Sequence, residues 1–154
     1  MIELEQPVER ALLVGAPLKS VPPALVEEHL QELGRLADTA GAEVVGTLLQ
    51  RLDHPQPRLY LGEGKAAELR ELVQETEATL VIFDEELSPA QGKNLEEFTG
   101  TRIMDRAELI LDIFATRARS SEARAQVELA QLQYLRPRLT RMWAHLSRIR
   151  GGPG

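Results

Sequence analysis

Short apolar segments alternate with longer amphipathic segments over the first 105 residues of the chain. The short segments read as buried strands because they are rich in Val, Ile and Leu and end at Gly, Pro or Asp; they are 10–16, 42–49, 79–83 and 101–105. The longer ones place apolar residues at helical steps of three and four; they are 23–40, 64–77 and 88–98. This alternation predicts an α/β fold with a parallel sheet of about four strands flanked by helices.

The predicted helix at 88–98 begins with a recognisable cap. Ser88 is followed three residues later by Gln91, and such a pair can satisfy the free N–H groups of the first turn reciprocally. Asp105 and Glu108 repeat this spacing. We therefore expect Asp105 to cap a further helix.

No strand pattern returns after Asp105. One helix has an apolar face made by Leu109, Ile110, Ile113 and Phe114. A second helix begins near Ser121 and carries a coiled-coil-like seam, with Arg136 where one apolar residue is due. The seam consists of Ala125, Leu129, Leu132, Leu139, Trp143 and Leu146. Pro137 is expected to kink or break this helix. The seam must be buried against a partner, which is either missing from this chain or lies in another molecule.

The composition is typical of a cytoplasmic protein. No stretch approaches the roughly 20 apolar residues that a bilayer-spanning helix needs, and the first residues lack the basic and apolar parts of a secretory signal. The chain has no cysteine, which excludes disulfides, thiolate metal sites and a cysteine nucleophile. We expect a cytoplasmic protein that does not span a membrane.

Charge is distributed unevenly along the chain. The net charge is −6, yet the segment from Arg136 to Gly154 holds five of the 18 basic residues and none of the 24 acidic ones. A basic tail on an acidic body favours contact with a polyanion through the tail. The alternative is that these arginines only solubilise an apolar helix.

Gly62, Gly64 and Lys65 open a predicted helix in a way that is similar to part of a phosphate-binding loop. A Walker A loop needs a glycine five residues before Gly64 and Ser or Thr after the lysine. The chain has Leu59 and Ala66 at those positions, so the Walker interpretation fails. Free N–H groups at a helix start beside a lysine can still hold an anion, and the turn is either such a site or a plain helix start.

Histidines and paired carboxylates are the remaining candidates for chemistry. The histidines are His29, His54 and His145. They show no metal-ligand spacing, so no metal site is predicted. Asp84, Glu85 and Glu86 stand at the carboxyl end of a strand, where α/β proteins place functional groups. Because no nucleophile or histidine accompanies them, we interpret them as a solvated turn.

The basic end of the chain has the composition of an RNA-binding segment. Arginine supplies phosphate contacts and stacking, and glycine lets a backbone approach crowded nucleotides. Trp143 fits the apolar seam and is expected to be a core residue. The candidate RNA contacts are Arg136, Arg138, Arg141, His145, Arg148, Arg150, Gly151 and Gly152.

Ordered blocks of the sequence resemble one family of bacterial translational GTPases. They include TAGAEVVG at 39–46, YLGEGK at 60–65 and VIFDEELSPAQ at 81–91. The further blocks are 94–96, 105–106, 109–115, 117–118, 126–132, 137–139 and 142–148. Because they follow the family's order from Arg10 to Arg148, the chain resembles the amino-terminal region of the HflX family.

The resemblance implies a parent of four parts: an α/β domain, two long antiparallel helices, a GTPase domain and a short carboxyl-terminal domain. Residues 1–117 would form the α/β domain, 118–147 the first long helix, and 148–154 a disordered loop rich in Gly and Arg. The chain alone would be no enzyme and would hold no cofactor, because it has neither a Walker A motif nor a GTPase domain. GTP and Mg²⁺ would belong to the rest of the parent.

The resemblance also implies a partner. HflX proteins dock on the large ribosomal subunit, where the loop between the two helices reaches toward the peptidyl-transferase centre, and they split or rescue stalled ribosomes under stress. Contacts with rRNA are therefore expected at the basic end. Two alternatives stay open. One is an ATP-binding module that uses Gly62, Gly64 and Lys65. The other is a homodimer through the seam residues Leu129, Leu132, Leu139, Trp143 and Leu146.

Overall fold

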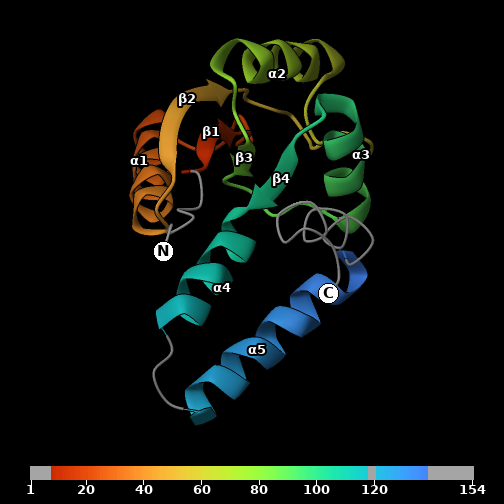
Figure 1. The fold of residues 1–154 in the computed structure, drawn as a ribbon. Coiled ribbons are helices and arrows are strands. Elements are labelled where there is room, and N and C mark those ends of the chain that lie inside the picture. The colour runs from red at the N-terminus through yellow and green to blue at the C-terminus, as the bar shows by residue number, and fades with distance from the viewer. Residues whose placement is uncertain (1–7, 118–120, 139–154) are drawn as a thin grey trace.

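A computed structural model describes residues 8–117 and 121–138 and shows a four-stranded sheet with helices on both faces (Figure 1). The strands are β1 (Arg10–Gly15), β2 (Glu43–Leu49), β3 (Leu80–Phe83) and β4 (Arg102–Asp105). The helices are α1 (Pro23–Thr39), α2 (Glu63–Thr76), α3 (Pro89–Thr99), α4 (Arg106–Arg117), α5 (Ser121–Leu135) and the 3-10 helix η1 (Arg136–Arg138). All strand pairs are parallel, which confirms the predicted α/β fold.

The sheet separates two apolar cores. One core lies against α2 and α3 and contains Leu69, Phe83 and Leu95. The other lies against α1 and α4 and contains Leu33 and Ile82. Successive side chains of a strand point to opposite faces, so Ile82 and Phe83 belong to different cores. Burial on both faces explains why β1 and β3 are continuous apolar runs.

The predicted caps lie at the starts of α3 and α4. Ser88 Oγ accepts a hydrogen bond from the Gln91 N–H at 3.1 Å, and Gln91 Oε1 accepts one from the Ser88 N–H at 2.9 Å. Asp105 Oδ1 accepts a hydrogen bond from the Glu108 N–H at 3.0 Å. Both predicted caps are confirmed. Gly100 ends α3 with φ of +72°, a conformation that suits glycine because it has no Cβ.

The strand order β2-β1-β3-β4 gives the sheet a switch point. From β1 the chain goes to β2 on one side and then to β3 on the other. In sheets of this kind a crevice opens at the carboxyl ends of the two strands where the direction changes. Here those strands are β1 and β3.

Helix α4 buries part of its predicted apolar face. Leu109 and Ile113 are buried in the core beside α1. Phe114 is 55% exposed, in contrast to the predicted packing of all four apolar residues. Successive residues of a helix are rotated by about 100° around its axis. Phe114 therefore points away from the core that Ile113 enters, and its ring is exposed.

Helix α5 lies against α4 with a face different from the predicted seam. Its half-buried residues Ala123, Val127, Ala130 and Tyr134 recur at steps of four and three and share one side of the helix. On another side, the seam residues Leu129 and Leu132 are 57% and 61% exposed. The seam residues Leu139, Trp143 and Leu146 lie outside the described residues. Helix α5 ends at Leu135 and η1 contains Pro137, which confirms the predicted break.

Candidate functional site

The carboxyl edge of the sheet gathers acidic side chains from two strands. Asp84 and Glu85 follow β3, and Asp105 is the last residue of β4. Because the strands are parallel, their carboxyl ends meet at one edge. This edge is therefore the leading candidate for a functional site.

Asp84 is held in an ion pair at this edge. Arg106 donates to its Oδ1 from Nε at 2.8 Å and from Nη2, and the Asp84 side chain is only 10% exposed. The same guanidinium donates to Glu32 Oε1 at 2.8 Å and to the backbone carbonyl of His29 at 2.8 Å. Arg106 thus ties α4 to α1 and to the end of β3. The interpretation of this carboxylate as part of a solvated turn is wrong, because Arg106 covers it.

Glu85 lies at the switch point between β1 and β3. Its carboxylate accepts the backbone N–H of Ala16, just past the end of β1, at 2.8 Å. Burial raises the pKa of Glu85, and the neighbouring carboxylate of Asp84 raises it further, against the lowering effect of the Ala16 N–H and of Arg106. Folds of this kind often bind anions at the switch point through backbone N–H groups. Here the carboxylate of Glu85 already occupies the N–H of Ala16 and adds negative charge, so the crevice disfavours a phosphate.

Asp105 accepts hydrogen bonds from three parts of the chain. Oδ1 accepts the Glu108 N–H, while Oδ2 accepts the Leu87 N–H at 3.1 Å and the hydroxyl of Tyr134. The residue is 3% exposed. Its carboxylate therefore joins the end of β4, the segment before α3, the start of α4 and the end of α5. A carboxylate with this many internal donors is held in one orientation and serves as a structural anchor.

The predicted anion site lies at the start of α2, with internal partners already in place. Gln50 Oε1 accepts the N–H of Gly62 at 3.0 Å. Lys65 Nζ pairs with Glu68 Oε2 at 3.0 Å. Glu63, in the first turn, supplies the negative charge that a helix amino terminus favours. Gly64 is exposed, and a Cβ there would meet no atom within 4 Å. An anion at this site would compete with these contacts, and the site stays a prediction.

Histidines and acids do not gather into a metal site in the part of the chain that the structure describes. No group of three or more metal-ligating side chains occurs there. The backbone carbonyl of His29 accepts a hydrogen bond from Arg106, and His54 is exposed. His145 lies outside residues 8–117 and 121–138. Nor is any helix in these ranges long and apolar enough to cross a membrane.

The predicted RNA-binding residues begin at the end of α5. Arg136 is exposed and opens η1, which lies against α3. Arg138 closes η1. Beside Arg136, a shallow hollow is lined by Leu129, Leu132 and Gln133. The other predicted contacts lie outside the described residues; they are Arg141, His145, Arg148, Arg150, Gly151 and Gly152.

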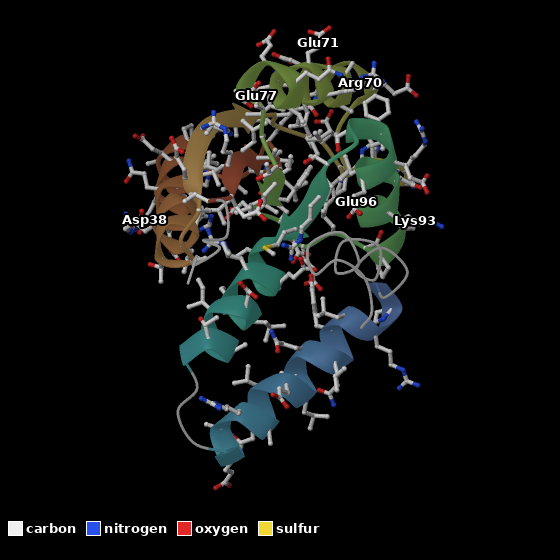
Figure 2. The ribbon with its side chains drawn as sticks, in the orientation of Figure 1. Asp38, Arg70, Glu71, Glu77, Lys93 and Glu96 are labelled. Carbon is white, nitrogen blue, oxygen red and sulfur yellow. The ribbon has the colours of Figure 1, made fainter. Side chains whose placement is uncertain are left out.

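Several exposed acidic side chains lie on the α/β domain away from α5. Figure 2 shows Glu71 on α2 and Glu77 directly after its end, both far from α5, and Asp38 on the outer side of α1. All three residues are exposed. Arg70 also lies on α2, with its guanidinium 4.4 Å above the ring of Phe98. These three acidic side chains lie away from the helix end that carries Arg136, whereas α5 itself carries the exposed acids Glu122 and Glu128.

Two organising residues were not identified from the sequence. Arg106 and Tyr134 hold the carboxyl edge together through contacts with Asp84 and Asp105. The contacts span 22 and 29 residues of sequence, beyond the reach of helix or strand periodicity. The available signal was an arginine directly after a strand-ending aspartate.

Comparison with known proteins identifies the family. The profile of the family described as GTP-binding GTPase N-terminal matches residues 27–115, and that described as GTP-binding GTPase Middle Region matches residues 117–154. GTPase HflX of Escherichia coli is 50% identical over 82% of this chain and 30% of that protein. GTPase HflX of Caldanaerobacter subterraneus is 50% identical over 100% of this chain and 35% of that protein. The chain spans about a third of the length of these relatives.

Solved structures share the fold. The crystal structure of the complex of SsGBP and GDP matches with a TM-score of 0.67 and 25% identity over 87% of this chain and 37% of that one. A GTP-binding protein from Sulfolobus solfataricus in complex with GDP gives a TM-score of 0.64 and 24% identity over 93% of this chain and 42% of that one, a likeness of fold alone. By the family profiles and these relatives, the chain belongs to the HflX family of GTP-binding proteins and matches its amino-terminal and middle regions.

Proposed function

We propose that this chain is the amino-terminal, ribosome-docking part of an HflX-type GTPase, and that its basic end meets the rRNA of the large ribosomal subunit. GTP binding with Mg²⁺ and GTP hydrolysis belong to the further length that the relatives have. In the whole protein, docking serves to split or rescue stalled ribosomes in the cytoplasm.

The position of Arg136 carries the proposal. Arg136 is exposed at the end of α5 and opens the segment that holds five arginines and no acid. The acidic residues Glu71, on α2, and Glu77, directly after it, lie away from this helix end (Figure 2). Segregated basic charge steers a protein onto a polyanion by one face only. Ribosomal RNA is the polyanion that the family membership favours.

Sedimentation of the 154-residue chain with purified large subunits tests the proposal. The wild type should co-sediment with large subunits, and the variant with both Arg148→Ala and Arg150→Ala should do so more weakly, because each arginine lost removes a phosphate contact. Arg35→Ala is the matched control, since Arg35 is an exposed arginine on α1. It should leave binding unchanged. Equal losses for the control and the double variant would contradict a specific role of the basic end.

The exposed leucines of α5 favour self-association as a second candidate. Leu129 and Leu132 are more than half exposed and line the hollow beside Arg136. Apolar surface of this kind marks interaction sites when it is contiguous. Sedimentation equilibrium over a concentration series tests this: a dimer that Leu129→Gln and Leu132→Gln together abolish supports it, and a strict monomer excludes it.

A further inference from the structure

Helix α5 is joined to the α/β domain with little buried apolar surface. From Glu122 to Pro137 the structure describes no side chain as fully buried. The half-buried residues of α5 include the alanines Ala123 and Ala130, and the two leucines Leu129 and Leu132 are more than half exposed. A helix held by few buried apolar contacts opens more easily than the core of a protein. Polar contacts therefore matter for holding the end of α5 against the α/β domain.

Tyr134 makes the polar contact at the critical end of α5. Its hydroxyl donates to Asp105 Oδ2, within the last turn of the helix. A second hydrogen bond, from Gln131 Nε2 to the carbonyl of Leu111, is 3.4 Å long and so weaker. Hydrogen bonds to an ionised carboxylate are stronger than those between neutral groups.

Asp105 is suited to be the fixed side of this contact. Two backbone N–H groups, of Leu87 at 3.1 Å and of Glu108 at 3.0 Å, hold the carboxylate from the segment before α3 and the start of α4. The residue is 3% exposed and ends a strand of the sheet. A carboxylate clamped in this way has one orientation, and the tyrosine hydroxyl must come to it.

Arg136 follows Tyr134 by two residues, and Pro137 then ends the regular helix. With so short a connection, the position of the hydroxyl sets where Arg136 stands and where η1 meets α3. We propose that the hydrogen bond between Tyr134 and Asp105 is a positioning contact, which fixes the end of α5 on the α/β domain and so presents Arg136 to RNA in one orientation. The RNA step of this inference rests on the proposed function, and the anchoring step does not.

Hydrogen exchange on the 154-residue chain tests the anchoring step. Tyr134→Phe keeps the ring and removes only the hydroxyl, so the α/β domain should unfold at the same temperature as in the wild type. Amides near the end of α5 should exchange about tenfold faster, because an opening that formerly broke a charged hydrogen bond now costs less. Tyr60→Phe is the matched control, since it removes the same atom from the α/β domain and should leave exchange in α5 unchanged. Unchanged exchange in Tyr134→Phe would overturn the proposal.

A double-mutant cycle on binding to purified large subunits tests the positioning step. Arg136→Ala should weaken binding of the wild type several-fold and should weaken binding of Tyr134→Phe less, because the arginine is then no longer held in place. Independent effects of the two changes would overturn positioning even if α5 exchanges faster. If the wild type does not bind at all, the proposed function fails, while the exchange measurement still decides whether Tyr134 anchors α5.

Discussion

The guanidinium of Arg106 donates two hydrogen bonds to a single carboxylate oxygen of Asp84. The Asp84 side chain is 10% exposed, whereas that of Glu32, which pairs with the same guanidinium, is 50% exposed. Partners that share one cation but differ in burial should therefore differ in their effect on stability.

Asp84→Asn should lower the free energy of unfolding by about 2 kcal/mol, because it leaves the Arg106 cation without its buried counter-charge. Glu32→Gln should lower it by less than about 0.5 kcal/mol, since exposed ion pairs contribute little. Urea denaturation of both variants at neutral pH measures the difference. Equal losses would show that Arg106 does not depend on the buried partner.

The raised pKa of Glu85 should make the stability of the protein depend on pH. Burial raises the pKa of this carboxyl above its ordinary value of 4.5, so between 4.5 and the raised value the folded state binds the proton more tightly than the unfolded state. The stability that Glu85 contributes is thus present below pH 4.5 and is lost as the pH rises through the folded-state pKa.

Glu85→Gln should remove this loss, because the amide oxygen still accepts the Ala16 N–H and never ionises. Its stability relative to the wild type should rise with pH above 4.5. The exposed neighbour provides the control, since Glu86→Gln should follow the wild-type curve. The free energies of unfolding of the three proteins are measured over a pH series. Parallel curves for the wild type and Glu85→Gln would show that the buried carboxyl does not cause the pH dependence of stability.

Two glycines should respond in opposite directions to the same substitution. Gly64 lies in the first turn of α2 with open space around its Cβ position, so Gly64→Ala should stabilise the protein by up to about 1 kcal/mol. Gly100 has φ of +72°, so Gly100→Ala should destabilise it by about 1 kcal/mol. The urea midpoints of the two variants should move apart. A shift in the same direction would contradict the assigned conformations.

Lys65→Ala should leave the affinity for ATP and GTP unchanged. Lys65 already pairs with Glu68, and the N–H of Gly62 is bound by Gln50, so a phosphate would have to displace both contacts. Nucleotide titration of the wild type and Lys65→Ala measures this, with Lys93→Ala on α3 as the exposed control. A clear loss of ATP affinity confined to Lys65→Ala would establish the phosphate site that the sequence suggested.

The sequence was sufficient to predict the fold because its signals are local. Strands and helices follow from apolar periodicity, and the caps at Ser88 and Asp105 from residues three apart. The architecture then follows, since alternating strands and helices allow few arrangements. Strand order and the exposure of Phe114 depend on how helices sit on the sheet, which periodicity does not report.

The candidate site was less accessible from the sequence. Asp84 and Asp105 were visible as acids at strand ends, but their roles depend on Arg106 and Tyr134, which are distant in sequence or lie on another helix. The seam of α5 was recognised as apolar, yet the helix packs on α4 through smaller residues such as Ala123 and Ala130. Small residues give a weak hydrophobic signal even where they form the contact.

The salt dependence of binding to large ribosomal subunits tests the central claim most directly. The logarithm of the affinity of the 154-residue chain should fall linearly with the logarithm of salt concentration, because arginines at the basic end release counterions from rRNA. Replacing Arg148 and Arg150 by Ala should reduce the slope by about two. Absent binding, or an affinity that does not change with salt, would contradict the account.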